Sequence, residues 1–299
     1  MSDLGQFFKS VPPVTRTITL TSLVMAGLNS LKIIPIGEFT CEFPIIFHKF
    51  EIHRLLTGFL IPNPQAMQGM MEIYMLYSFS KGIEEGKFKK NLPDYIYYFM
   101  IVLPTILVGT FLFVPPMYSL HPALLSALTF TWSVHNYNQQ VNFYFMPIQA
   151  SLLPGVSLGF RLLVDGFESF LLSLIGCAGA YAYNCLETKS SGPLQSLLTG
   201  HEPELDPNHN RLGTINSNVK PWFYSTGLLN APQWLKGFIS RLTGVDYDSP
   251  AYRRGFVGTG LRKNSTNSGT SGSKLGGIKL GGGGAFRGSG RRLGSTKDD

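Results

Sequence analysis

Two serines and a histidine near the middle of the chain are of the types that an intramembrane serine protease uses. Ser126 and Ser133 are candidate nucleophiles, and His135 is a candidate base. Such an enzyme needs a serine on a tight glycine-containing turn, a facing histidine and an oxyanion hole. Neither serine lies in a G-x-S-G context, and no histidine lies in mid-span opposite a serine. We therefore predict a non-catalytic protein, with proteolysis by these residues as the alternative.

Glu72 is a second chemical candidate because it lies inside an apolar segment. An ionisable group at mid-membrane costs roughly 2.5 to 3.5 kcal/mol on insertion scales. Three interpretations stay open: Glu72 lies at an interface, it is protonated and bonded to a neighbouring helix, or it serves a lipid-handling or transport protein.

Patterns for cofactors are missing from the sequence. There is no Walker loop, zinc-ligand spacing or dinucleotide fingerprint, and GGIKLGGGG in the tail follows no strand. Cys41, Cys177 and Cys185 show neither metal-ligand nor disulfide spacing. Basic residues of the tail lack interleaved aromatic residues. We expect no metal, no cofactor and no nucleic-acid partner.

The elements that must position these residues belong to a membrane domain. Between Asp94 and Arg161 lie 66 residues without Asp, Glu, Lys or Arg, which is too long for a soluble core. Residues 1–186 contain 10 basic and 10 acidic residues, whereas 187–299 contain 15 and 8, so the formal charge of +7 lies in the tail.

Six membrane spans are predicted, and both termini are expected in the cytosol. The third and sixth spans carry no charge, whereas the second, fourth and fifth are polar enough to face other helices. Loop 81–91 has four lysines, which places it in the cytosol and loop 38–63 on the luminal side, lying in the membrane interface. The predicted spans are residues 17–37, 65–81, 95–116, 121–137, 146–164 and 169–186.

Small residues predict where two of these spans pack closely. Gly176 and Ala180 form a small-xxx-small pair in the sixth span, and Gly155 and Gly159 form another in the fifth. Either pair allows close contact between helices.

The tail, residues 189–299, is polar and past Asn264 has the composition of a flexible linker, so we expect it to be largely disordered. One island, residues 231–242, predicts an amphipathic helix, with Asn230 as its cap and Pro232 in its first turn. This helix either lies in the membrane interface or packs as a cap on the cytosolic side.

Several stretches resemble the derlin family, the protease-dead relatives of rhomboids. The resemblance covers most of residues 1–190, including QFFKSVPPVTRTITL near the start and EIYMLYSFSKGIEEGKF at 72–88. EIHRLLTGFLIPN is similar to the luminal W-R-x-x-T stretch, with Arg54 and Thr57 matching and His53 in place of tryptophan. GCAGAYAYNCLE resembles the sixth-span G-x-x-x-G pattern, with Gly176 kept and Ala180 for the second glycine.

The resemblance implies an all-α, six-span rhomboid-like bundle of the endoplasmic reticulum membrane, with a lateral gate between its second and fifth spans. Its domains would be a cytosolic segment 1–16, a membrane domain 17–188 and a cytosolic tail 189–299. It further implies a role in endoplasmic-reticulum-associated degradation, with misfolded membrane proteins as clients and a ubiquitin-ligase complex and membrane lipids as partners. Short, polar spans would thin the bilayer and ease the passage of polar segments.

The tail also resembles the SHP boxes of long-tailed fungal derlins, which bind a hexameric AAA ATPase, valosin-containing protein. An F-x-G-x-G-x-x-L box lies at 286–293, and a second candidate at 256–263 has Lys263 in place of the leucine. Such a peptide pairs with a sheet edge while its apolar side chains fill pockets. The matching residues are Phe286, Gly288, Gly290 and Leu293 in the first box and Phe256, Gly258 and Gly260 in the second.

Overall fold

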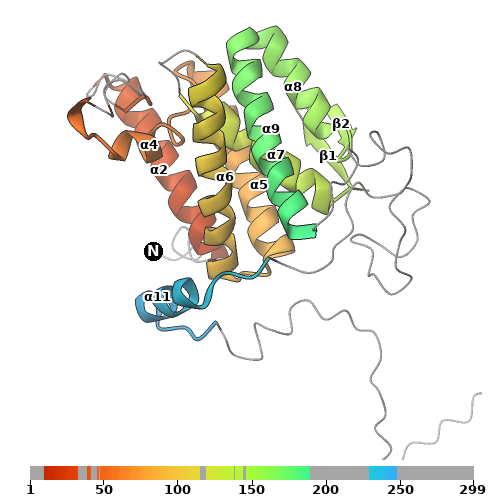
Figure 1. The fold of residues 1–299 in the computed structure, drawn as a ribbon. Helices are drawn as coiled ribbons and strands as arrows, with labels where there is room; N and C mark the ends of the chain where they lie inside the picture. The colour runs from red at the N-terminus through yellow and green to blue at the C-terminus, as the bar shows by residue number, and fades with distance from the viewer. Residues whose placement is uncertain are drawn as a thin grey trace, which may run out of the picture. The chain divides into compact units, whose positions relative to one another are not determined.

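The described part of the chain is mostly helical. This computed structural model describes residues 10–32, 39–41, 46, 48–114, 119–137, 139–143, 146–188 and 229–247. Its longer helices before residue 189 run side by side (Figure 1). They are α2 (Pro13–Ser30), α5 (Ala66–Gly82), α6 (Leu92–Phe113), α7 (His121–His135), α8 (Leu153–Val164) and α9 (Phe167–Thr188).

Shorter elements connect or cap these helices. They are α4 (His53–Thr57), the π-helix η2 (Ile83–Lys87) that continues α5, the antiparallel strands β1 (Gln140–Phe143) and β2 (Met146–Gln149), and α11 (Gln233–Thr243). In Figure 1 the turn between α8 and α9 marks the upper end, and α11 lies crosswise at the lower end.

Helix α7 forms the centre of the bundle. Twelve of its 15 residues are buried, and it packs against α5, α8 and α9. Its closest neighbour is α9, because Gly176 lies directly on the α7 backbone: a Cβ added there would lie 2.0 Å from the carbonyl oxygen of Ala123. Only glycine fits this approach.

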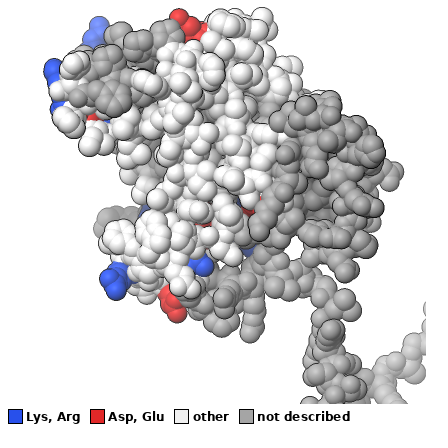
Figure 2. All heavy atoms as spheres, in the orientation of Figure 1, with Lys and Arg blue, Asp and Glu red and all other residues white. Residues whose placement is uncertain are grey.

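The surface of the bundle carries an uncharged band. In Figure 2, Lys, Arg, Asp and Glu show near the upper edge and around α11, and the described surface between them is uncharged. Two described helices, α6 and α9, are long and apolar enough to cross a membrane. The third and sixth predicted spans therefore lie in helices of suitable length and composition.

The fifth predicted span is wrong at its start. Residues 146–149 pair with β1 as a strand, and α8 begins only at Leu153, with Pro154 in its first turn. Proline suits the first turn of a helix because its missing N–H is not needed there. The hairpin is an exception to the all-α prediction, and it leaves α8 with 12 residues.

Two smaller predictions are also corrected. The first helix begins at Pro13 and ends at Ser30, where residues 17–37 were expected, and Lys32 just beyond it has a φ of 53°. A Cβ at Gly155 or Gly159 would meet nothing within 4 Å, so this pair makes no close helix contact in the described structure.

Candidate functional site

A buried ion network joins the upper parts of α5 and α8. The Glu72 side chain on α5 is 3% exposed, and Arg161 on α8 is 9% exposed. Arg161 Nη1 donates to Glu72 Oε1 at 3.1 Å and to Asp165 Oδ2 at 3.2 Å. One guanidinium therefore serves two carboxylates, one on each helix.

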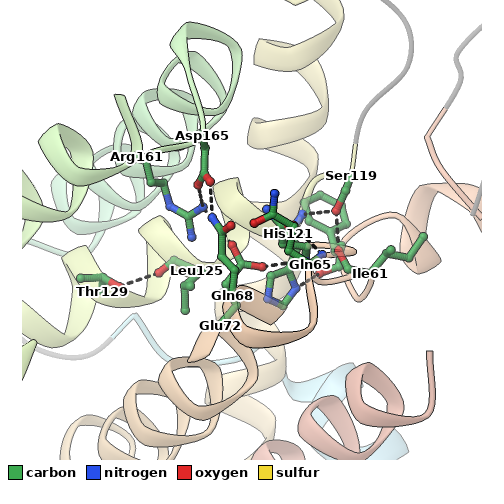
Figure 3. A network of polar contacts seen from close by, with 12 residues as sticks. Ile61, Gln65, Gln68, Glu72, Ser119, His121, Leu125, Thr129, Arg161 and Asp165 are labelled. Carbon is green, nitrogen blue, oxygen red and sulfur yellow. Dashed lines mark hydrogen bonds and ion pairs between the residues drawn. The ribbon is translucent and has the colours of Figure 1, made fainter. Parts of the chain in front are cut away.

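Two further contacts complete the network (Figure 3). The Gln68 side-chain amide donates to Asp165, and the backbone N–H of Asn63 donates to Glu72 Oε2 at 2.8 Å. Gln68 and Glu72 are four residues apart on α5, and Arg161 lies four residues before Asp165, which caps the C-terminus of α8, so each pair lies on one helix face. The two faces are turned toward each other (Figure 3).

The network joins α5 to α8, although the two helices have little direct contact with each other. The backbones of α5 and α8 both pack along α7, whereas their mutual contact is much smaller. A cavity of about 20 Å³ lies beside the ion pair, with room for about one water. Its polar lining comes from Glu72, Ser126, Thr129, Ser157, Arg161 and Asp165.

Histidine 121 connects the start of α7 to the segment that leads into α5. His121 Nδ1 lies 3.0 Å from the carbonyl oxygen of Phe59, and Ser119 Oγ donates to the carbonyl of Ile61. The other ring nitrogen, Nε2, is buried and has no partner among the described residues. Figure 3 shows this imidazole near Glu72.

The lower end of α5 contacts both α7 and α2. A Cβ at Gly82 would lie 2.5 Å from Trp132 Nε1, so α5 and α7 are in close contact there. In η2, Glu84 accepts hydrogen bonds from the N–H groups of Val14 and Thr15 at 3.2 and 2.8 Å, which caps the N-terminus of α2. Burial raises the pKa of Glu84, and the hydrogen bonds from Thr15 partly oppose this.

The lysine of η2, Lys87, contacts α9. Lys87 Nζ donates to Glu187 Oε2 at 2.7 Å and to Asn184 Oδ1 at 3.3 Å, and it lies 4.9 Å from the ring centroid of Tyr183. The π-helix thus links α5 to two other helices through side chains three residues apart. A π-helical turn often marks a functional position in a helix.

The serines considered for proteolysis have other contacts. Ser133 Oγ donates to the carbonyl of Ala150, and Ser126 lines the small cavity. Nδ1 of His135, at the end of α7, has no hydrogen-bond partner in the described part of the chain. Within the same residues, no group of three His, Cys, Asp or Glu side chains could hold a metal ion.

The expected luminal-loop residues lie in or next to α4. Arg54 is buried, bonds Glu51 and donates to the carbonyl of Thr40 at 3.5 Å. Thr57 Oγ1 donates to the carbonyl of Phe39 at 3.2 Å, whereas His53 is exposed. Arg54 and Thr57 thus fasten this loop to the segment before it.

Of the remaining predicted residues, some lie in the described part of the chain and others do not. Gly176 and the fully buried Ala180 both lie in α9. Both candidate boxes of the tail, 256–263 and 286–293, lie outside the described residues.

The sequence prediction found Glu72 and missed its partners Arg161, Asp165 and Gln68. A signal was present, because Arg161 is the first charged residue after the charge-free segment. The interpretation of Glu72 as protonated and bonded to a neighbouring helix is met in part, because the side chain does bond α8 but through an ion pair with Arg161.

Comparisons with known proteins place the sequence among members of one family. The model of the Der1-like family matches residues 11–199. DER1-like family member protein 1 of Saccharomyces cerevisiae is 28% identical, over 97% of this chain and 91% of the relative. A derlin-like protein of Schizosaccharomyces pombe is 26% identical over 62% of this chain and 83% of its own length, and Derlin-1 of Bos taurus 27% identical over 61% and 73%.

Proposed function

The chain belongs to the Der1-like family, and on that premise we propose that it is a non-catalytic dislocation factor of endoplasmic-reticulum-associated degradation. In this proposal the six long helices are six membrane spans, both termini lie in the cytosol, and the lower end of Figure 1 is the cytosolic end. Misfolded membrane proteins are the clients, and the protein moves them without cutting them.

The observation that carries the proposal is the way in which α5 and α8 are joined. They correspond to the second and fifth spans, between which the family resemblance implies a lateral gate. Here the two helices meet through the Glu72–Arg161–Asp165 network instead of close backbone packing. Polar side-chain contacts can be exchanged for others, so a client can displace them without unpacking α7.

Short helices support the same function through the bilayer. At 1.5 Å per residue, the 12 residues of α8 span about 18 Å, against roughly 30 Å of hydrocarbon. A bilayer adapts to a short span by thinning. Thinner hydrocarbon lowers the cost of moving a polar client segment across it.

The tail supplies the energy source in this proposal. Phe286 and Leu293 of the first box, together with Phe256 of the second, would bind a hexameric AAA ATPase. Two boxes on one chain make the second contact intramolecular, which raises the overall affinity. The ATPase then pulls clients that a ubiquitin-ligase complex has marked.

A cross-linking experiment tests the gate. Gln68→Cys plus Asp165→Cys places one thiol on each side of it, and a short reducible cross-linker joins α5 to α8. We expect cross-linking to stop ATP-driven extraction of a client from proteoliposomes and reduction to restore it, with the single-cysteine variants as controls. Full extraction by the cross-linked protein would disprove the gate.

A pull-down tests the tail separately. Phe286→Ala plus Leu293→Ala should reduce ATPase capture at least tenfold, and adding Phe256→Ala should remove the remainder if the second box binds. Arg287→Ala, which leaves the apolar anchors in place, is the matched control. Unchanged capture by the triple variant would show that the boxes do not recruit the ATPase.

A further inference from the structure

Helix α11 has two apolar stripes, and only one of them is covered. Leu235 and Ile239 are buried against the start of α6, where they meet Leu92, Ile96 and Tyr97. The second stripe points away from the bundle. It consists of Trp234, Phe238 and Leu242, which are 63%, 59% and 71% exposed.

The exposed stripe is continuous and adjoins basic side chains. Its members are four residues apart, so they lie in one row along the helix. Lys236 and Arg241 lie on either side of the apolar surface, and α11 itself contains no acidic residue. An apolar row beside basic residues is typical of helices that lie in a membrane interface.

A hydrogen bond sets the level of α11 relative to the bundle. The N–H of Ala231 donates to Asp94 Oδ1 at 2.7 Å. Asp94 is the last charged residue before the 66-residue uncharged segment. It therefore marks the point where α6 enters the hydrocarbon, and α11 is tied to that point.

The orientation of α11 is also suited to a position at the membrane surface, near Asp94. It lies crosswise to the long helices, at the lower end of the bundle (Figure 1). In Figure 2 the surface at this end is mostly uncharged, with blue basic and red acidic atoms at its edges. The exposed apolar side chains of α11 thus lie at the same end of the bundle as Asp94 and the start of α6.

We propose that the Trp234–Phe238–Leu242 stripe inserts into the phospholipids of the cytosolic leaflet next to α6. The indole of Trp234 would lie at the headgroup level, which tryptophan prefers, and Lys236 and Arg241 would reach lipid phosphates. The sequence left two interpretations of this helix open, a helix in the membrane interface and a packed cap. In this proposal the exposed stripe lies in the interface and the buried stripe packs on the bundle. Its predicted cap is corrected: Pro232 occupies the N-cap position, and Asp94 binds the adjacent Ala231.

Depth-dependent quenching of Trp234 fluorescence tests the proposal on the full chain in liposomes. The chain has three tryptophans, so Trp222→Phe is used as background and the signal of a Trp222→Phe plus Trp234→Phe variant is subtracted. Lipids brominated high on the acyl chain should quench the Trp234 signal at least twofold, and aqueous iodide should quench it little. Strong iodide quenching with no effect of bromolipid would overturn the proposal and indicate water or another protein on the stripe.

Matched variants separate insertion from folding. Phe238→Ser plus Leu242→Ser leaves the buried stripe intact and should reduce bromolipid quenching at least twofold without lowering the thermal stability of the bundle. Gln233→Ala plus Ser240→Ala, on the polar side of α11, should leave quenching unchanged. Equal quenching in both double variants would contradict insertion through this stripe. None of these results depends on ATPase recruitment or client extraction.

Discussion

Two helix pairs of the bundle, α7 with α9 and α5 with α8, are joined by different means. In the first pair Gly176 brings the backbones into direct contact, so the helices cannot separate without losing packing along their length. In the second pair charged side chains bridge the helices, and a small cavity remains beside them. The bundle therefore combines a rigid contact with one that can exchange partners.

The largest effect is expected where a side chain is forced into the rigid contact. Gly176→Ala places a Cβ 2.0 Å from the Ala123 carbonyl oxygen, so backbone must shift. We expect a loss of about 3 kcal/mol or more in the free energy of unfolding in detergent. Gly155→Ala is the control, because its Cβ meets nothing within 4 Å. Similar stability of both variants would contradict the distinction between the two pairs.

The second prediction tests whether a contact made by charged side chains is always weaker than one made by close backbone packing. Lys87→Met would leave Glu187, which is 9% exposed, without its buried ion pair. Removing one partner of a buried pair costs about 3 to 5 kcal/mol, so thermal unfolding should show a large loss. Lys90→Met removes a similar charge from an exposed pair with Glu85 and should cost less than about 1 kcal/mol. A small effect of Lys87→Met would mean that η2 does not hold α9.

The third prediction concerns the contact that can open. Glu72→Gln weakens the bridge to Arg161 while Asp165 still pairs with it, so the fold should survive. A cysteine at position 126, in the cavity, reports opening in a background that lacks Cys177 and Cys185. We expect its maleimide labelling to rise roughly tenfold, equivalent to about 1.4 kcal/mol.

Glu85→Gln is the control for this labelling, because it removes the same charge from an exposed position. If the labelling rates of Glu72→Gln and Glu85→Gln stay within twofold of each other, the Glu72 bridge does not hold α5 and α8 together.

The smallest effect is expected from the pH dependence of the α2 contact. Because burial raises the pKa of Glu84 above the ordinary 4.5, the folded state holds this proton more tightly than the unfolded state. This stabilisation is complete below pH 4.5 and is lost as the pH rises through the folded pKa. Glu84→Gln should reduce the change in the free energy of unfolding over this pH range. If the change with pH stays the same, it arises from the titration of another group.

The sequence resemblance to derlins is confirmed by the family match. The charge-free segment also predicted where α6 and α7 lie, because lipid-facing and buried helices both exclude charge. The ends of the helices were harder to predict. Residues 146–149 form a strand because they pair with β1, and their own sequence does not show this.

Contacts between distant residues were the hardest to predict. The spacing of Gly155 and Gly159 is the same as that of Gly176 and Ala180, yet only in α9 does the glycine face a neighbouring backbone. Arg161 and Glu72 are 89 residues apart, so their pairing depends on how α5 and α8 lie around α7. Local pattern gives the residue types, and tertiary packing decides which of them meet.

The cap that Glu84 places on α2 has a consequence for biosynthesis. Thr15 and Glu84 are separated by 69 residues, and at 5 to 20 residues per second a ribosome needs roughly 3 to 14 s to add them. During that interval the first N–H groups of α2 must stay bonded to water or lipid headgroups. The N-terminus of α2 can therefore receive this cap only after η2, which follows α5, has been synthesised.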